Sequence, residues 1–68
     1  MRDVKVAFGQ RLRDLRTKKN ISQEALAHKA GLDRTYLSGV ERGKRNISLE
    51  NIEKLARALS INIKGFFD

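Results

Sequence analysis

The sequence predicts an all-α fold of five short helices, and three observations support this prediction. The chain has 68 residues without proline, and no stretch of it alternates apolar and polar residues over the length of a strand. Apolar residues instead recur at helical spacing. Four times, an apolar residue stands directly before a Ser, Asp or Asn and is followed at helical distance by a second apolar residue, which is the pattern of a capped helix start. A chain of this length has room for one domain, which we expect to span residues 1–68.

The first helix is expected over residues 4–19. Phe8, Leu12 and Leu15 are spaced so that they lie on one face of a helix, and Asp3 stands where it can cap the first turn. Two lysines at the end of this segment suit the negative end of the helix dipole.

The later helix starts share one pattern. Ser22 caps a helix, while Ile21 before it packs against Leu26 as a hydrophobic staple. Gly31 ends this helix, and Gly43 ends the next one in the left-handed conformation that glycine adopts at least cost. The repeated pattern predicts helices over residues 23–30, 34–41, 49–59 and 63–67, with Ser22, Asp33, Ser48 and Asn62 as their N-caps.

The apolar faces of these helices define the expected core. Disulfides and zinc, the usual stabilisers of so small a chain, are excluded because the sequence has no Cys and a single His. We therefore expect no metal and no cofactor, and a second copy of the chain remains as the stabilising partner. The expected core consists of Phe8, Leu12, Leu15, Leu26, Ala27, Ala30, Leu37, Val40, Ile52, Leu55 and Leu59.

The chain is strongly basic, with 15 Lys and Arg against 8 Asp and Glu and a formal net charge of +7. The excess lies in residues 1–20 and 32–46, while the remaining segments are neutral. Such a charge favours nucleic acid first and an anionic membrane surface second, with an ordinary solvated face as the alternative. No apolar run approaches the roughly 18 residues of a membrane helix, so we expect a cytoplasmic protein without membrane association.

The predicted helix over residues 34–41 suits the major groove of DNA. It begins with Arg34, carries small or polar residues on its exposed side, and is followed by a cluster of basic residues. The major groove admits an α-helix whose first turns read base edges, while flanking cations hold phosphates. The pattern therefore favours double-stranded DNA as the partner.

Residues 23–43, QEALAHKAGLDRTYLSGVERG, resemble the helix-turn-helix of the XRE-type, lambda-repressor-like DNA-binding domains. The resemblance extends from RLRDLRTKKNISQEALA to LENIEKLARALSI, nearly the whole chain, and LDRTYLSGVERGKRN is similar to the controller proteins of restriction-modification systems. It implies a compact five-helix domain whose second and third helices form the helix-turn-helix. It also implies a transcription regulator that binds a roughly palindromic operator as a homodimer and regulates its own gene. No small-molecule effector is evident.

The resemblance assigns roles position by position. Base reading falls to Arg34, Thr35, Ser38 and Gly39. Arg34 is the first candidate, because arginine pairs with guanine through two hydrogen bonds. Arg16 and Glu41 match an ion pair that links the first and third helices, the alternative being two separate surface charges. Phosphate binding falls to Gln23, Tyr36, Arg42, Lys44, Arg45 and Asn46.

Three of these roles leave alternatives open. Tyr36 either packs as a core aromatic or contacts the DNA backbone, since a tyrosine has one apolar and one polar end. Gly39 has no side chain to donate a hydrogen bond, so it either allows close approach of the duplex or packs near the first helix. Arg45 either binds phosphate or reaches a base or the minor groove.

The last residues of the chain are apolar beyond what a core of this size requires. Either they cap the core of one protomer or part of them forms a two-fold interface, and we expect the interface. Two recognition helices related by that axis would read half-sites about one helical turn apart. The expected interface residues are Ile47, Leu49, Ile61, Ile63, Phe66 and Phe67.

Two other classes of function compete with DNA-binding regulation. Catalysis is not expected, because Ser22 and Ser48 are helix caps and the one histidine, His28, has no Cys or acidic partner placed by the sequence. An antitoxin that binds a toxin and its own promoter also uses an XRE-type domain. It usually carries a further toxin-binding segment, for which 68 residues leave little room.

Overall fold

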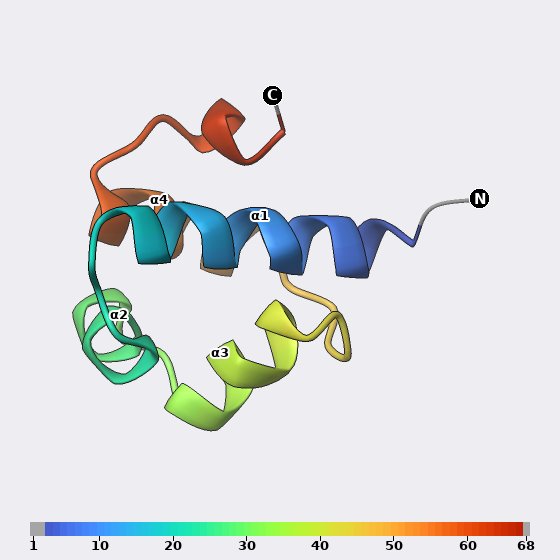
Figure 1. Cartoon of the computed structure of the whole chain (residues 1–68), viewed down its shortest axis with the longest axis horizontal. Helices are drawn as coiled ribbons and strands as arrows, with labels where there is room; N and C mark the ends of the chain where they lie inside the picture. Colours follow the sequence, from blue (N-terminus) through green and yellow to red (C-terminus); the bar gives the residue numbers. More distant parts are fainter. Residues whose placement is uncertain (1–2, 68) are drawn as a thin grey trace.

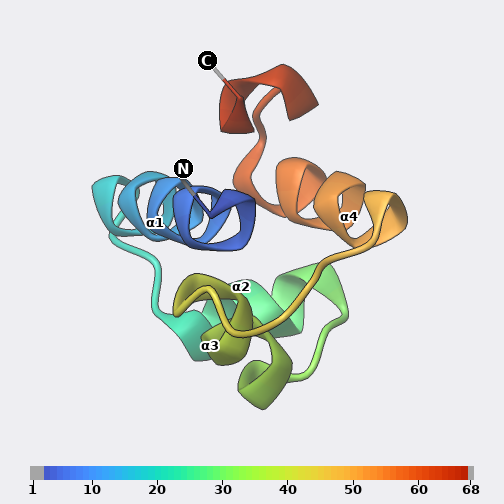
Figure 2. The same cartoon turned by 90° about the vertical axis from the view of Figure 1, so that its right-hand side faces the viewer.

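The computed structural model describes residues 3–67 and contains helices but no strands over that range. The α-helices are α1 (Val4–Lys18), α2 (Gln23–Ala30), α3 (Arg34–Glu41) and α4 (Leu49–Leu59), and the 3₁₀ helix η1 (Ile63–Phe66) follows them. In Figure 1, α1 runs across the molecule with α2 and α3 below it and η1 above it. Figure 2 shows α1 and α4 flanking the middle of the molecule, with α2 and α3 on one side and η1 on the other. The predicted all-α fold is confirmed.

Each helix starts at the residue that the cap pattern predicted. The side chains of Ser22, Asp33 and Ser48 accept hydrogen bonds from backbone N–H groups three residues later, at 3.0 to 3.2 Å. Asp3 and Asn62 accept from the second residue that follows them, at 2.8 and 3.0 Å. These side chains satisfy N–H groups that have no partner within the helix, so they fix where each helix begins.

One predicted helix is corrected. The segment expected as a fifth α-helix over residues 63–67 is a 3₁₀ helix of four residues, Ile63–Phe66. Its bonds run from Gly65 N to Asn62 O and from Phe67 N to Lys64 O, which is 3₁₀ spacing. A segment this short forms too few hydrogen bonds to offset the cost of starting an α-helix, so the tighter single turn forms instead.

The core contains most of the predicted residues, and α4 contributes more buried residues to it than predicted. Leu12, Leu26, Leu37 and Leu55 have no exposed surface, whereas the predicted core residue Leu15 is half-buried at the edge. Because α2 packs against one side of α4 and η1 against another, α4 buries more than a single stripe. The core residues that the prediction lacked are Ala56, Ala58 and Phe66.

Phe66 belongs to the core of the protomer, which corrects its predicted place in a dimer interface. Its ring is 4 % exposed and lies 5.1 Å from the ring of Phe8, centroid to centroid. The Nε of Arg11 donates to the carbonyl oxygen of Gly65 over 2.9 Å and so ties η1 to α1. Because η1 is held against α1, the Phe66 ring can pack on Phe8, and removing its apolar surface from water stabilises that position.

Gly9 is the point of closest approach between α1 and α3. It is buried, and a Cβ atom placed on it would lie 2.6 Å from the carbonyl oxygen of Glu41 and 2.9 Å from its carbonyl carbon. Real Cβ atoms do not approach the backbone this closely, and backbone cannot move aside as the end of a side chain can. The absence of a side chain at Gly9 therefore sets the distance between the two helices.

Gly9→Ala is expected to destabilise the domain by about 1 to 3 kcal/mol, the usual cost of overpacking a tight contact. Helix propensity alone predicts the opposite sign, because alanine is favoured over glycine inside a helix by about 1 kcal/mol. Thermal unfolding followed by circular dichroism decides between them. Gly65→Ala is the matched control, since its Cβ would lie 3.5 Å from Ile61 Cδ1, an ordinary contact. A Gly9→Ala variant more stable than the unaltered protein would contradict this account of the packing.

Candidate nucleic-acid interface

α2 and α3 form a helix-turn-helix unit. α2 ends at Gly31, whose φ of 71° is left-handed, and α3 begins after Asp33, whose Oδ2 accepts from the N–H of Tyr36 over 3.2 Å. α3 packs against α1 and α2 and lies at the edge of the molecule, where Figures 1 and 2 show it on the side away from η1. One long side of α3 therefore faces solvent.

The sequence divides α3 into a buried and an exposed face. Leu37 and Val40 are buried in the core, whereas Arg34 and Thr35 at the start of the helix are exposed and Ser38 one turn later is half-buried. Three of the four predicted base-reading residues thus have accessible surface on the outer side of α3. A helix with this distribution can enter a groove by its first turns.

Gly39, the fourth predicted base-reading residue, is buried in the structure. The stem of Arg45 covers it: a Cβ placed on Gly39 would lie 2.7 Å from Arg45 Cγ. The side chain of Arg45 therefore lies between Gly39 and solvent, and the base-reading role of Gly39 stays a prediction. The lack of a side chain at Gly39 makes room for Arg45 to lie back over α3.

Tyr36 packs through its ring, and its contact with the DNA backbone stays a prediction. Its ring is half-buried and packs against the core, with the guanidinium carbon of Arg45 5.6 Å from the ring centroid. Its hydroxyl lies outside the core, where it accepts from Asn51 Nδ2 over 3.1 Å and contacts the carbonyl oxygen of Asn46 at 3.5 Å. The aromatic part is structural, and the polar end lies among the candidate phosphate-binding residues.

The loop after α3 carries the remaining predicted phosphate-binding residues in exposed positions. Gly43 in this loop has a φ of 74°, and a Cβ on it would lie 2.8 Å from the Cα of Val6. A glycine is needed there for both reasons, and it lets the loop turn back against α1. The exposed polar residues of the loop are Arg42, Lys44, Arg45 and Asn46.

Arg16 and Glu41 form the ion pair that the resemblance implied. Arg16 Nε donates to Glu41 Oε2 over 2.6 Å and Nη2 donates to Oε1 over 3.0 Å, with side-chain exposures of 11 % and 3 %. The remaining terminal nitrogen of Arg16 donates to the carbonyl oxygen of Ile21 over 2.8 Å. This two-pronged geometry joins α1, the turn before α2, and α3.

Gln23, a predicted phosphate-binding residue, is part of the same network. Its Nε2 donates to Glu41 Oε1 over 3.0 Å, and the side chain is half-buried at the start of α2. A side-chain amide has two N–H donors. Glu41 therefore orients the amide through one N–H donor, and the second donor takes no part in this contact.

The predicted interface residues divide into two groups. Leu49 and Phe67 are 77 % and 62 % exposed, and Ile63 is also exposed. Ile47 and Ile61 are half-buried and pack against the core from its edge. Since Phe66 is in the core, the predicted interface residues that remain exposed are Leu49, Ile63 and Phe67.

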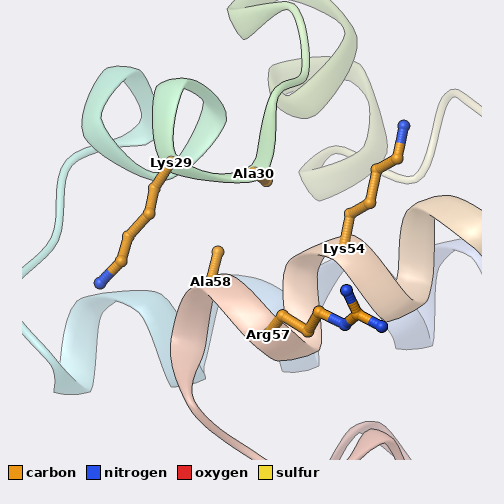
Figure 3. A pocket seen from close by; sticks show the side chains of 5 residues that line it. All are labelled: Lys29, Ala30, Lys54, Arg57 and Ala58. Carbon is orange, nitrogen blue, oxygen red and sulfur yellow. The ribbon is translucent and has the colours of Figure 1, made fainter.

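A second basic region lies away from α3, in a cleft between the end of α2 and the middle of α4. The cleft has a volume of about 320 Å³, a floor of Ala30 and Ala58, and walls of Lys29, Lys54 and Arg57. Figure 3 shows the amino groups of Lys29 and Lys54 pointing away from each other. The three cations therefore do not converge on one point as the ligands of a single anion would.

Sequence reasoning missed several residues that join elements far apart in the chain. Gly9 and Arg11 carry no local signal, because their partners lie on α3 and η1. The contact between Asn51 and Tyr36 could not be predicted either, since the two residues lie on different helices. Residues 3–67 contain no group of three His, Cys, Asp or Glu side chains placed to hold a metal ion. None of the helices described there is long and apolar enough to cross a membrane.

Comparison with known proteins identifies the family. Residues 12–66 match the family model described as "Helix-turn-helix". The chain is 48 % identical over 67 residues to the control protein C.BamHI of Bacillus amyloliquefaciens, covering 97 % of this chain and 83 % of that protein. The crystal structure of the restriction-modification controller protein C.AhdI from Aeromonas hydrophila is 62 % identical, with a TM-score of 0.91 and coverage of 93 % and 96 %.

A second similar structure contains DNA. The controller protein C.Esp1396I bound to a 19 base pair DNA duplex is 35 % identical to this chain, with a TM-score of 0.86 and coverage of 93 % of this chain and 84 % of that chain. The match to the family model spans both helices of the unit formed by α2 and α3. The chain belongs to the helix-turn-helix family of DNA-binding transcription regulators, which are not enzymes, and within that family it is similar to the controller proteins of restriction-modification systems.

Proposed function

We propose that this protein is a sequence-specific DNA-binding transcription regulator that binds a roughly palindromic operator as a homodimer in the cytoplasm. We further propose that it is an autoregulating controller protein of a restriction-modification system. The observation that carries the proposal is the outer face of α3, where Arg34 and Thr35 are exposed while the opposite face is buried. The similarity to controller proteins, one of them bound to a DNA duplex, supports it.

In the proposed binding mode, one set of residues contacts base edges and another set contacts phosphates. Arg34, Thr35 and Ser38 contact base edges in the major groove, and Arg34 pairs with a guanine through two hydrogen bonds. The loop cations Arg42 and Lys44 bind phosphates, which position α3 without reading sequence. Gln23, Tyr36, Arg45 and Asn46 complete the set of backbone contacts.

A homodimer accounts for three of the exposed apolar residues and predicts a symmetric operator. Leu49, Ile63 and Phe67 expose apolar surface that a second copy of the chain would cover, with Ile47 and Ile61 at its edge. A small domain without disulfide or metal also gains stability from such a contact. The two copies of α3 then face successive turns of the major groove.

Selection of duplexes from a random pool is the experiment that tests the proposal. We expect an inverted repeat with half-sites roughly 10 base pairs apart, centre to centre, as two helix-turn-helix units related by a two-fold axis require. Recovery of no common sequence would refute specific DNA binding, and a single unrepeated site would refute the dimeric mode.

Arg34→Ala is expected to relax sequence preference at one base pair in each half-site, with a loss of about 1 to 3 kcal/mol of discrimination per contact. Arg42→Ala is the matched control, because removing a phosphate-binding cation should weaken binding to all duplexes alike. Competition binding with duplexes altered at single positions measures both effects. Identical behaviour of the two variants would show that these roles are wrongly assigned.

A further inference from the structure

The hydroxyl of Tyr36 is held by a residue outside the helix-turn-helix. Asn51, in the first turn of α4, donates from Nδ2 to Tyr36 Oη over 3.1 Å. Asn51 is half-buried, and its backbone N–H is fixed by Ser48 Oγ at 3.1 Å. The donor thus stands on a capped helix start, which fixes its position relative to α3.

This hydrogen bond decides where the hydroxyl proton of Tyr36 points. A tyrosine hydroxyl has one proton and two acceptor lone pairs. Because the Asn51 amide occupies a lone pair, the proton points away from Asn51. The hydroxyl oxygen lies 3.5 Å from the carbonyl oxygen of Asn46, which is long for an O–H···O hydrogen bond. The proton is therefore free for a stronger acceptor supplied from outside the chain.

The surroundings of this hydroxyl favour an anionic acceptor. The guanidinium of Arg45 lies over the ring of Tyr36, and Arg34 and Arg42 are exposed at the two ends of the same helix. A guanidinium beside a directed O–H donor suits a phosphate oxygen, since hydrogen bonds to charged acceptors are roughly twice as strong as neutral ones. In a DNA-binding mode this acceptor is a phosphate of the duplex backbone.

We propose that Asn51 is a positioning residue for DNA binding, which orients the Tyr36 hydroxyl so that it donates its proton to a backbone phosphate. The inference rests on the proposed function. It adds a residue of α4 to which neither the helix-turn-helix pattern nor the loop of basic residues assigns a role. The recognition surface then includes the start of α4, coupled to α3 through one side-chain contact.

A cycle of variants tests the coupling, with a duplex selected by the unaltered protein as the probe. Asn51→Ala removes the contact that directs the Tyr36 O–H donor, and Tyr36→Phe removes the donor itself. Each should therefore weaken binding about three- to tenfold, and the double variant should bind no more weakly than Tyr36→Phe alone. The chain has one Tyr and no Trp, so its intrinsic fluorescence comes from Tyr36 alone. The emission change on adding duplex should be smaller in Asn51→Ala.

Asn51→Asp provides a second variant of nearly the same shape. A carboxylate only accepts hydrogen bonds, so the Tyr36 hydroxyl would donate to the introduced carboxylate instead of to the phosphate. The negative charge of the carboxylate would also repel the phosphate. We expect a larger loss of binding than for Asn51→Ala, at unchanged thermal stability, because an acidic residue suits the first turn of a helix.

Two results would overturn the positioning role: normal binding by either Asn51 variant, or an equal loss from Asn51→Ala with and without Tyr36→Phe. In the second case Asn51 would act independently of the hydroxyl. If the unaltered protein selects no duplex at all, the proposed function itself fails, so the two kinds of failure are distinct.

Discussion

Replacing Glu41 by alanine is expected to leave the domain largely unfolded at room temperature. The carboxylate accepts two hydrogen bonds from Arg16 and one from Gln23, and its side chain is 3 % exposed. Truncation leaves the nearly buried guanidinium of Arg16 without its counter-charge, which costs about 3 to 5 kcal/mol. A core of this size supplies roughly the same amount in total. Far-ultraviolet circular dichroism against temperature measures the loss.

Glu53→Ala is the matched control for this prediction. Its pair with Arg57 spans 3.7 Å and is exposed on both sides, so its removal should change stability by no more than about 1 kcal/mol. Replacing Arg16 and Glu41 together by apolar residues should recover much of the loss, because no uncompensated charge then remains. If Glu41→Ala and Glu53→Ala melt at the same temperature, the Arg16 pair does not join α1 to α3.

Operator affinity is expected to fall about a thousandfold between about 50 and 200 mM salt, because about six phosphate contacts release that many counterions. The number follows from the exposed loop cations Arg42, Lys44 and Arg45, counted once in each protomer of a dimer. Fluorescence anisotropy of a labelled operator, titrated at several salt concentrations, gives the slope of log affinity against log salt.

Two variants show whether that slope comes from the loop. Arg42→Ala removes one cation per protomer and should lower the slope by about two. Lys54→Ala removes an equal charge from the cleft between α2 and α4 and should leave the slope unchanged. Equal slopes for these two variants would mean that net charge, and not the loop, governs the electrostatic attraction.

Some features of the candidate site could be predicted from nearby residues in the sequence, and others depend on contacts with distant residues. The exposure of Arg34 and Thr35 follows from helical spacing, and it could be predicted. The burial of Gly39 could not, because it depends on the side chain of Arg45 lying back over α3. The role of Asn51 was equally hidden, since its partner Tyr36 precedes it by 15 residues on another helix.

By itself, the sequence determined where the helices of this protein begin and most of the residues that they bury. Caps, staples and glycine stops act within one turn, so Ser22, Asp33 and Ser48 reveal their effect without knowledge of the fold. Only the tertiary structure decided that Gly9 sets the spacing of α1 and α3, and that Phe66 fills the core instead of an interface. Those outcomes arise from contacts between segments far apart in the chain, where the geometry of the whole packed domain decides which surfaces are covered.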